Sequence, residues 1–244
     1  MNFSNNKLIN ITIWTAIPVI IFAIYLFTLS SNNLPKLVRG NAVYPPVAIK
    51  NLSLKDQNNV VVNTKRLKGH WTFVFFGFTH CPDVCPATIA QLKKIKKDIH
   101  SNTDYGAVTQ FFFVSVDPQR DSLEHLSAYM KYFDPSFIAM TGEQNKISTF
   151  EEQLGAFHRL GKKNADGNYN VQHSADIFLI NTRAELIAKF QPPMDTEIIT
   201  QQFSTFVALE ETAENNKLSE NNLESRLFQT ELPVIENQHG KWVV

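Results

Sequence analysis

The feature that most constrains the fold is the sequence WTFVFFGF at Trp71–Phe78, which is almost entirely apolar. A short apolar run of this kind is typical of a central strand that is buried on both faces of a sheet. A helical pattern begins a few residues later, at Pro86–Ile99, with lysines mainly on its other side. The apolar positions of this pattern are Ile89, Leu92, Ile95 and Ile99. We therefore expect a buried strand that turns almost directly into a helix.

Strand and helix patterns continue to alternate after this unit. Thr109–Val116 reads as a second apolar strand, and Asp121 looks like the N-cap of a following helix, with Glu124 at the capping-box position. The later expected elements are a helix at Leu123–Phe133, a helix at Ile147–Leu154, paired strands at Ile177–Ile180 and Glu185–Phe190, and a last helix capped by Asp195. This order predicts an α/β fold with a mixed central sheet flanked by helices and a final antiparallel pair.

The N-terminal region contains 22 uncharged residues, Leu8–Leu29. A helix of that length spans about 33 Å, and the hydrocarbon core of a bilayer is about 30 Å thick. The alternative, a cleaved signal peptide, usually has an apolar region of about 7–15 residues, and TLSSNN at 28–33 is a poor cleavage site. We expect a short N-terminal segment (1–7), one transmembrane anchor (8–29) and a linker (30–45). The basic residues on the two sides of the anchor do not decide its orientation.

The remaining chain divides at about Glu210. Residues 46–210 hold the predicted strands and helices, and residues 211–244 hold six Glu against three basic residues and many Asn. We expect a single compact domain followed by an acidic, partly disordered extension. The whole chain has 23 basic and 23 acidic residues, so a nucleic-acid partner is not expected. The lysines at 93–97 read as the solvated face of a helix.

Cys81 and Cys85 are the only cysteines, in the string FTHCPDVCP between the predicted strand and helix. A disulfide that closes so small a loop would add little stability, and a chain of this size does not need one in order to fold. Two thiols at the N-terminus of a helix can exchange electrons as a redox pair or hold one soft metal ion, because the helix dipole stabilises thiolate. The residues alone leave both kinds of chemistry open.

Three separate motifs resemble the Sco/SenC family. They are GFTHCPDVCP, VSVDPQRDSLEHLSAYMKYFDPSFIAMTG, and VQHSADIFLI with a later QPP. The resemblance runs from about Pro46 to about Leu209, and the motifs agree with the family in order and spacing. It implies a thioredoxin-like domain tethered to a membrane, with a role in the assembly of cytochrome c oxidase.

The resemblance also implies a metal site. In the family, the two cysteines of the CPxxCP string and one distant histidine bind a single copper ion, and the matching residues are Cys81, Cys85 and His173. His80, Asp83 and Asp117 are expected around the site rather than as ligands. His70, His100, His125, His158 and His239 show no ligand pairing in the sequence. The family often has an acidic residue before the histidine, whereas this chain has Gln172.

The expected function is that of a copper chaperone. It would receive copper from a donor protein and deliver it to the binuclear copper site of a cytochrome c oxidase subunit, from the bacterial inner membrane with the globular domain in the periplasm. The alternative is a thiol–disulfide oxidoreductase that uses Cys81 and Cys85 to reduce a partner's cysteines. A thiol peroxidase is disfavoured because the Pro-x-x-x-Thr-x-x-Cys pattern fails at both cysteines, with Phe78 in place of Thr for the first and Pro82 for the second.

Overall fold

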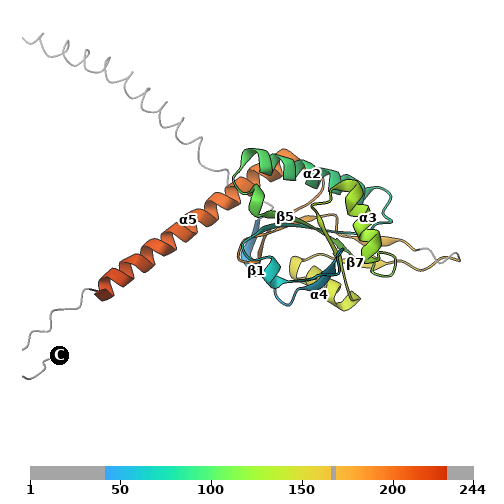
Figure 1. Ribbon diagram of the computed structural model, residues 1–244, viewed down its shortest axis with the longest axis horizontal. Coiled ribbons are helices and arrows are strands. Elements are labelled where there is room, and N and C mark those ends of the chain that lie inside the picture. The colour runs from blue at the N-terminus through green and yellow to red at the C-terminus, as the bar shows by residue number, and fades with distance from the viewer. Residues whose placement is uncertain (1–41, 166–168, 230–244) are drawn as a thin grey trace, which may run out of the picture. The chain divides into compact units, whose positions relative to one another are not determined.

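The computed structural model describes residues 42–165 and 169–229, with the side chains of the last helix described to residue 217. Its main feature is an eight-stranded sheet in the order β1-β10-β9-β4-β5-β6-β2-β3 (Figure 1). The strands of this sheet are β1 (Ala42–Ala48), β2 (Ser53–Asp56), β3 (Val61–Asn63), β4 (Trp71–Gly77), β5 (Thr109–Ser115), β6 (Ile138–Thr141), β9 (Ile177–Ile180) and β10 (Glu185–Phe190).

The other described elements are helices and one small hairpin. The helices are α2 (Val84–Asn102), α3 (Leu123–Phe133), α4 (Gln144–Leu154) and α5 (Thr196–Gln229), with 3-10 turns η1 (Thr64–Arg66) and η2 (Gly106–Val108). The hairpin pairs β7 (His158–Leu160) with β8 (Val171–His173) in antiparallel register.

The centre of the sheet confirms the expectation of a mixed α/β fold. β4 is parallel to β5 and antiparallel to β9, and β5 is parallel to β6. All seven residues of β4 are buried, as the apolar run predicted. Because β4 and β5 are parallel neighbours, their carboxyl ends meet at one edge of the sheet, which is where ligands bind in open α/β folds.

Helices cover both faces of the sheet. On one face, Phe203 of α5 contacts the ring of Trp71 edge-on, with centroids 5.4 Å apart, and Tyr129 of α3 packs on Phe113. On the other face, Phe150 of α4 packs against Phe76. Burying one such side chain completely contributes about 1.5–3 kcal/mol, so these contacts hold the two helical layers on the sheet.

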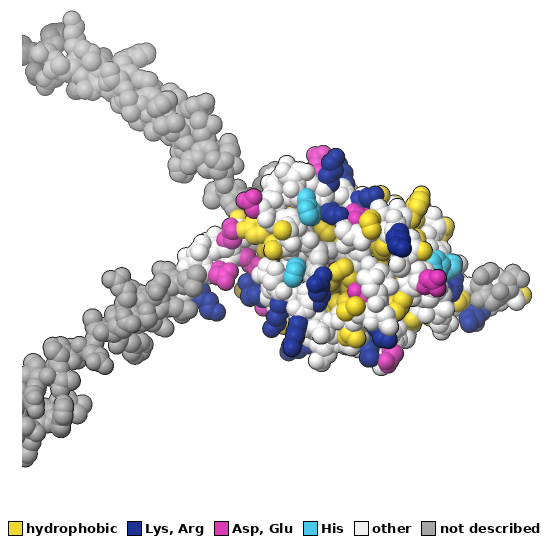
Figure 2. Space-filling model, in the orientation of Figure 1, with side chains coloured by type: hydrophobic (Ala, Val, Ile, Leu, Met, Phe, Trp, Pro, Cys, Tyr) yellow, Lys and Arg dark blue, Asp and Glu magenta, His cyan; other side chains and the backbone are white. Residues whose placement is uncertain are grey.

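The surface shows no concentration of one charge on the visible face. In Figure 2, Lys and Arg side chains are spread over the globule among apolar and uncharged ones. This distribution agrees with the balanced charge of the sequence.

Two expected boundaries were misplaced. The predicted linker, 30–45, ends inside β1, which pairs with β10 at the edge of the sheet and contains Pro45 and Pro46. Prolines are tolerated in an edge strand because its outer N–H groups need no partner, so they do not mark a linker here. The second boundary is the one at Glu210, after which an acidic, partly disordered extension was expected. The helix α5 continues across this position to Gln229. No Gly or Pro interrupts that stretch, and its Glu, Lys, Leu and Ala residues favour helix.

The cap expected at Asp121 was also wrong. Ser122 is the N-cap of α3, and its hydroxyl accepts a hydrogen bond from the amide of His125. The carboxylate of Asp121 points into the protein instead, where other donors satisfy it. Asp195 does cap α5, since its carboxylate accepts from the amides of Glu197 and Ile198.

The predicted anchor at 8–29 lies outside the described residues. Among the helices that the structure describes, none combines the length and the apolar character needed to cross a bilayer.

Candidate metal centre

The two cysteines lie where β4 turns into α2. Cys81 is in the loop, and Cys85 is the second residue of the helix, which begins at Val84, two residues before the start of the helical pattern in the sequence. The side chain of Cys85 is buried, Cys81 is half-buried, and the thiols are not joined in a disulfide. The amide of Cys85 donates to the sulfur of Cys81 over 3.4 Å, so the first turn of α2 draws the two residues together.

The buried position of Cys85 depends on a glycine in the neighbouring strand. A Cβ atom added at Gly77, the last residue of β4, would lie 2.8 Å from Cys85 Sγ and 2.8 Å from a ring carbon of Phe113. A Cβ atom essentially never lies so close to a sulfur or carbon to which it is not bonded. A larger residue at position 77 would therefore push the Cys85 sulfur away. Gly77 therefore provides the space that lets Cys85 face the sheet.

His173 comes to the cysteines from the β7–β8 hairpin. It is the last residue of β8, and its register partner in β7 is His158. Its Nε2 lies 3.5 Å from Cys85 Sγ. One ligand atom from each of Cys81, Cys85 and His173 lies within 4.8 Å of the other two. The structure thus brings together the three residues that the family resemblance singled out.

The ring of His173 is held in one orientation. Its Nδ1 lies 2.8 Å from the carbonyl oxygen of Ser174, which can only accept, so Nδ1 carries the proton and Nε2 offers a lone pair toward the sulfurs. Phe75 and Phe78 meet the ring edge-on, with centroids 6.0 and 5.8 Å away. A hydrogen bond on the remote nitrogen and apolar walls are how proteins orient a metal-binding histidine.

Burial favours the neutral forms of the Cys85 thiol and the His173 imidazole. It raises the pKa of the Cys85 thiol far above its ordinary value, although a hydrogen bond with the backbone of Phe78 opposes this; Cys81 and Asp121 add smaller increases. Burial also lowers the pKa of His173, although its hydrogen bond to Ser174 opposes this. The resting pair is therefore a thiol that donates to a neutral imidazole, and a soft metal ion would have to displace the thiol proton in order to bind.

A buried carboxylate joins the cysteine loop to the loop that follows β5. Asp121 is fully buried, and its oxygens accept from the amide of Thr79 at 3.0 Å and the hydroxyl of Thr79 at 2.5 Å. The hydroxyl of Ser115 donates to the same carboxylate at 2.6 Å. Thr79 stands two residues before Cys81, so these bonds hold the loop that carries the first sulfur.

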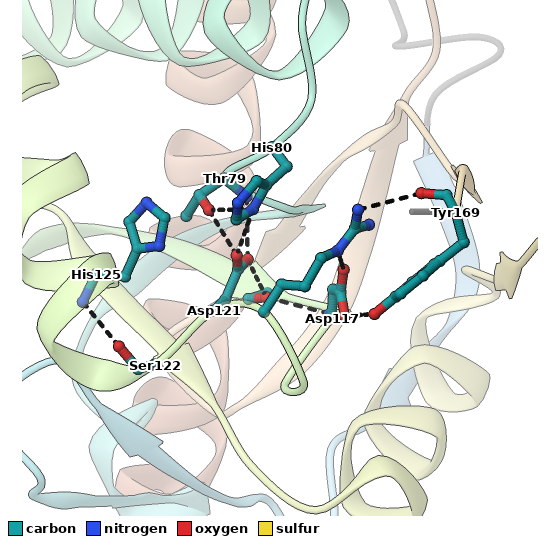
Figure 3. Close-up of polar contacts among 9 residues, drawn as sticks. Thr79, His80, Asp117, Asp121, Ser122, His125 and Tyr169 are labelled. Atoms are coloured by element: carbon teal, nitrogen blue, oxygen red, sulfur yellow. Dashed lines mark hydrogen bonds and ion pairs between the residues drawn. The ribbon is translucent and has the colours of Figure 1, made fainter. Parts of the chain in front are cut away.

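A second network holds the hairpin that carries His173. Asp117 is fully buried and accepts from the hydroxyl of Tyr169 at 2.6 Å and from the guanidinium of Arg120 (Figure 3). Arg120 also donates to the carbonyl of Tyr169 at 3.1 Å, and its guanidinium lies 3.9 Å from the centre of the Tyr169 ring. Asp117 was expected beside the site, and it acts there by tying the hairpin to the β5–α3 loop.

The other expected residues lie outside the three-residue cluster. Asp83 is exposed and precedes α2 without a side-chain cap, and Gln172 is exposed. His80 is exposed, and its Nδ1 contacts Thr79 and lies 3.5 Å from Asp121, so it is a neighbour rather than a member of the cluster.

Sequence reasoning missed several residues that the structure places near the site. His158 pairs with buried Glu151, with Nδ1 2.5 Å from the carboxylate. Tyr169 had no signal, because its role depends on a hairpin that the sequence did not predict. Tyr129 had been read only as part of a helix, yet its ring packs on Phe113, and its buried hydroxyl has no hydrogen-bond partner among the described residues. Burial raises the pKa of this hydroxyl.

Comparisons with known proteins show the family of this chain. The family model described as SCO1/SenC matches residues 45–208. A SCO2-like protein of Rickettsia prowazekii is 34% identical over 152 residues, which cover 62% of this chain and 72% of the relative. Among solved structures, Arabidopsis thaliana ScoI with copper bound has 28% identity and a TM-score of 0.60, covering 65% of this chain and 97% of that one. Bradyrhizobium japonicum ScoI with copper bound has 27% identity and a TM-score of 0.58, covering 65% and 98%.

The unequal burial of the thiols predicts unequal reactivity. With Cys85→Ser, the remaining Cys81 should be alkylated by iodoacetamide readily at pH 7–8. With Cys81→Ser, the remaining Cys85 should react about tenfold more slowly or worse, because it is buried and its raised pKa leaves little thiolate. Its rate should keep rising through pH 9, since the thiolate fraction grows about tenfold per pH unit below the pKa. Equal rates for the two single variants, measured by mass spectrometry, would contradict this description of the site.

Proposed function

This chain belongs to the SCO1/SenC family, and we propose that it is a membrane-anchored chaperone that carries one copper ion and delivers it to cytochrome c oxidase during assembly. The observation that carries the proposal is the convergence of two sulfurs and one imidazole, from Cys81, Cys85 and His173, within 4.8 Å. The two solved relatives at 27–28% identity are described with copper bound, which supports copper as the cargo.

The donor set suits copper in either oxidation state. Thiolates favour soft copper(I), and imidazole suits copper(I) and copper(II) alike. The residues would hold the ion with the two cysteine sulfurs and His173 Nε2, whose lone pair already faces Cys85. Both thiols must lose their protons, so loading releases protons and becomes more favourable as the pH rises.

The exposure of the loop supports delivery by ligand exchange. Cys81 is half-buried and Cys85 is buried, while Asp83 and Val84 between them are exposed, Val84 by 43%. A thiolate of the acceptor can bond to the ion from this open side before Cys81 releases it, and Cys85 and His173 let go afterwards. The metal passes on with no change in its charge, and each freed sulfur can take up a proton. The acceptor would be the copper-bearing oxidase subunit, and a separate donor protein would load the site.

The same reasoning gives the location. We propose that residues 8–29 anchor the chain in a bacterial inner membrane and that the globular domain faces the periplasm, which the uncharged length of this segment and the family together support. Alkaline phosphatase fused after Val244 should be active in intact cells, because that enzyme needs the oxidising periplasm. An inactive phosphatase fusion, together with fluorescence from a cytoplasmic reporter at the same position, would place the domain on the other side.

A second function is favoured by the free thiols themselves. The amide of Cys85 lies 3.4 Å from the sulfur of Cys81. As two thiols, this close pair can form a disulfide by giving two electrons and two protons to a disulfide of a partner protein. This would make the chain a thiol–disulfide oxidoreductase that prepares the partner's cysteines for copper. The exchange needs the two sulfurs and has no step that uses His173.

Substitution of His173 separates the two functions. The full chain, purified in mild detergent, should bind one copper(I) ion, and His173→Ala should weaken binding by about tenfold or more because a ligand is lost. Cys81→Ser or Cys85→Ser should abolish tight binding. The His173→Ala chain should still reduce a model disulfide. The control is His100→Gln, an exposed histidine of α2 outside the cluster, which should leave both properties unchanged.

Unchanged copper affinity in His173→Ala would remove this histidine from the site and leave the chaperone proposal without its carrying observation. Loss of disulfide reduction together with copper binding would instead contradict the independence of the two functions.

A further inference from the structure

A second group of metal-binding side chains lies beside the cysteine loop. His80, Asp121 and His125 each offer one ligand atom, and these three atoms lie within 4.8 Å of one another (Figure 3). His80 comes from the loop after β4, Asp121 from the loop after β5, and His125 from the first turn of α3. None of the three belongs to the cluster of Cys81, Cys85 and His173, and no sequence motif connects His125 with the others.

The separations fit ligands of one ion. The Nδ1 of His80 lies 3.5 Å from the Asp121 carboxylate, which is longer than the usual N–H···O hydrogen bond of about 2.7–3.2 Å. Two ligand atoms that each lie about 2.0–2.1 Å from a tetrahedral ion are about 3.3 Å apart. The rings of His80 and His125 have centroids 5.2 Å apart and planes at 76°, so they are not stacked face to face.

The carboxylate is prepared for this role. Asp121 is fully buried, and the amide of Thr79 and the hydroxyls of Thr79 and Ser115 hold both of its oxygens in place. Such bonds orient a carboxylate ligand in metal sites. Both histidines are exposed, so their rings can close the remaining distance, and solvent can fill the open coordination positions. The ion would replace the contact of 3.1 Å between His80 Nδ1 and the Thr79 hydroxyl.

We propose that His80, Asp121 and His125 form a second metal site, distinct from the cysteine site, for a divalent first-row cation such as Zn²⁺ or Cu²⁺. The donors are two imidazoles and one carboxylate, without sulfur. Nitrogen and oxygen donors of this kind suit divalent ions, whereas a thiolate pair favours copper(I) over copper(II). The loops after β4 and β5 would then carry two sites with different preferences for the oxidation state of the metal.

The test measures Zn²⁺ binding after the sulfurs have been removed. The full chain with Cys81→Ser and Cys85→Ser is titrated with Zn²⁺ by calorimetry, and it should bind one ion saturably. Adding His125→Ala, or separately His80→Ala, should weaken this binding by about tenfold or more, because each removes one ligand. Adding His100→Gln, which changes an exposed histidine elsewhere, should leave it unchanged. Both test histidines are exposed, so the variants should keep the folded circular dichroism spectrum of the parent chain.

Absence of saturable Zn²⁺ binding in the cysteine-free chain would overturn the proposal. So would equal affinity in the His125→Ala and His100→Gln chains, which would mean that His80 and Asp121 form only an ion pair beside an unrelated histidine. Because the test is done without the cysteines, either result leaves the copper proposal to be decided by its own experiment.

Discussion

The buried carboxylate of Asp121 is the constraint on which the arrangement of the site depends. A carboxylate without exposure to water is costly unless hydrogen bonds satisfy it, and Asp121 receives bonds from Thr79 and from Ser115. Ser115 is the last residue of β5, and Thr79 lies two residues after the end of β4, the adjacent parallel strand. The same hydrogen bonds that stabilise the buried charge therefore fix the path of the chain that leads to Cys81. One oxygen of the Asp121 carboxylate also faces His80.

The histidine reaches the cysteines by an independent route. The β7–β8 hairpin is a separate two-stranded sheet, and Tyr169 attaches it to the β5–α3 loop through Asp117 and Arg120. The sulfur of Cys85 packs against Gly77 of β4, where the missing side chain leaves room for it. The loop after β5 thus contacts both ligand-bearing segments, one through Asp121 and the other through Asp117. Burial favours the neutral forms of Cys85 and His173, so the two side chains can lie close together without repulsion between charges.

The sequence predicted the parts of this structure that have local signals. The apolar run at Trp71–Phe78 identified the central strand, and the cysteine spacing together with the family motifs identified Cys81, Cys85 and His173. The N-cap prediction was correct for Asp195 and wrong for Asp121. An Asp that precedes a helix gives the same sequence pattern whether its carboxylate caps the helix or is buried. The strand β1 was not predicted because it contains two prolines. An edge strand tolerates proline, whereas a central strand does not.

Contacts between distant segments gave no local signal. The short strands β7 and β8 have no apolar alternation, so neither the hairpin nor the role of Tyr169 could be predicted. His125 reads as one of several surface histidines until the fold sets it beside His80 and Asp121. In the sequence, Gly77 is a residue that disfavours a strand. The structure shows that the Cys85 sulfur occupies the position where a side chain at 77 would lie.

The central claim is that two sulfurs and one remote imidazole hold a single copper ion. X-ray absorption spectroscopy of the full chain loaded with one equivalent of copper(I) measures this directly. We predict two sulfur neighbours and one imidazole nitrogen, with the nitrogen contribution lost in His173→Ala and retained in His125→Ala. A spectrum without an imidazole, or one in which the imidazole persists without His173, would contradict the account.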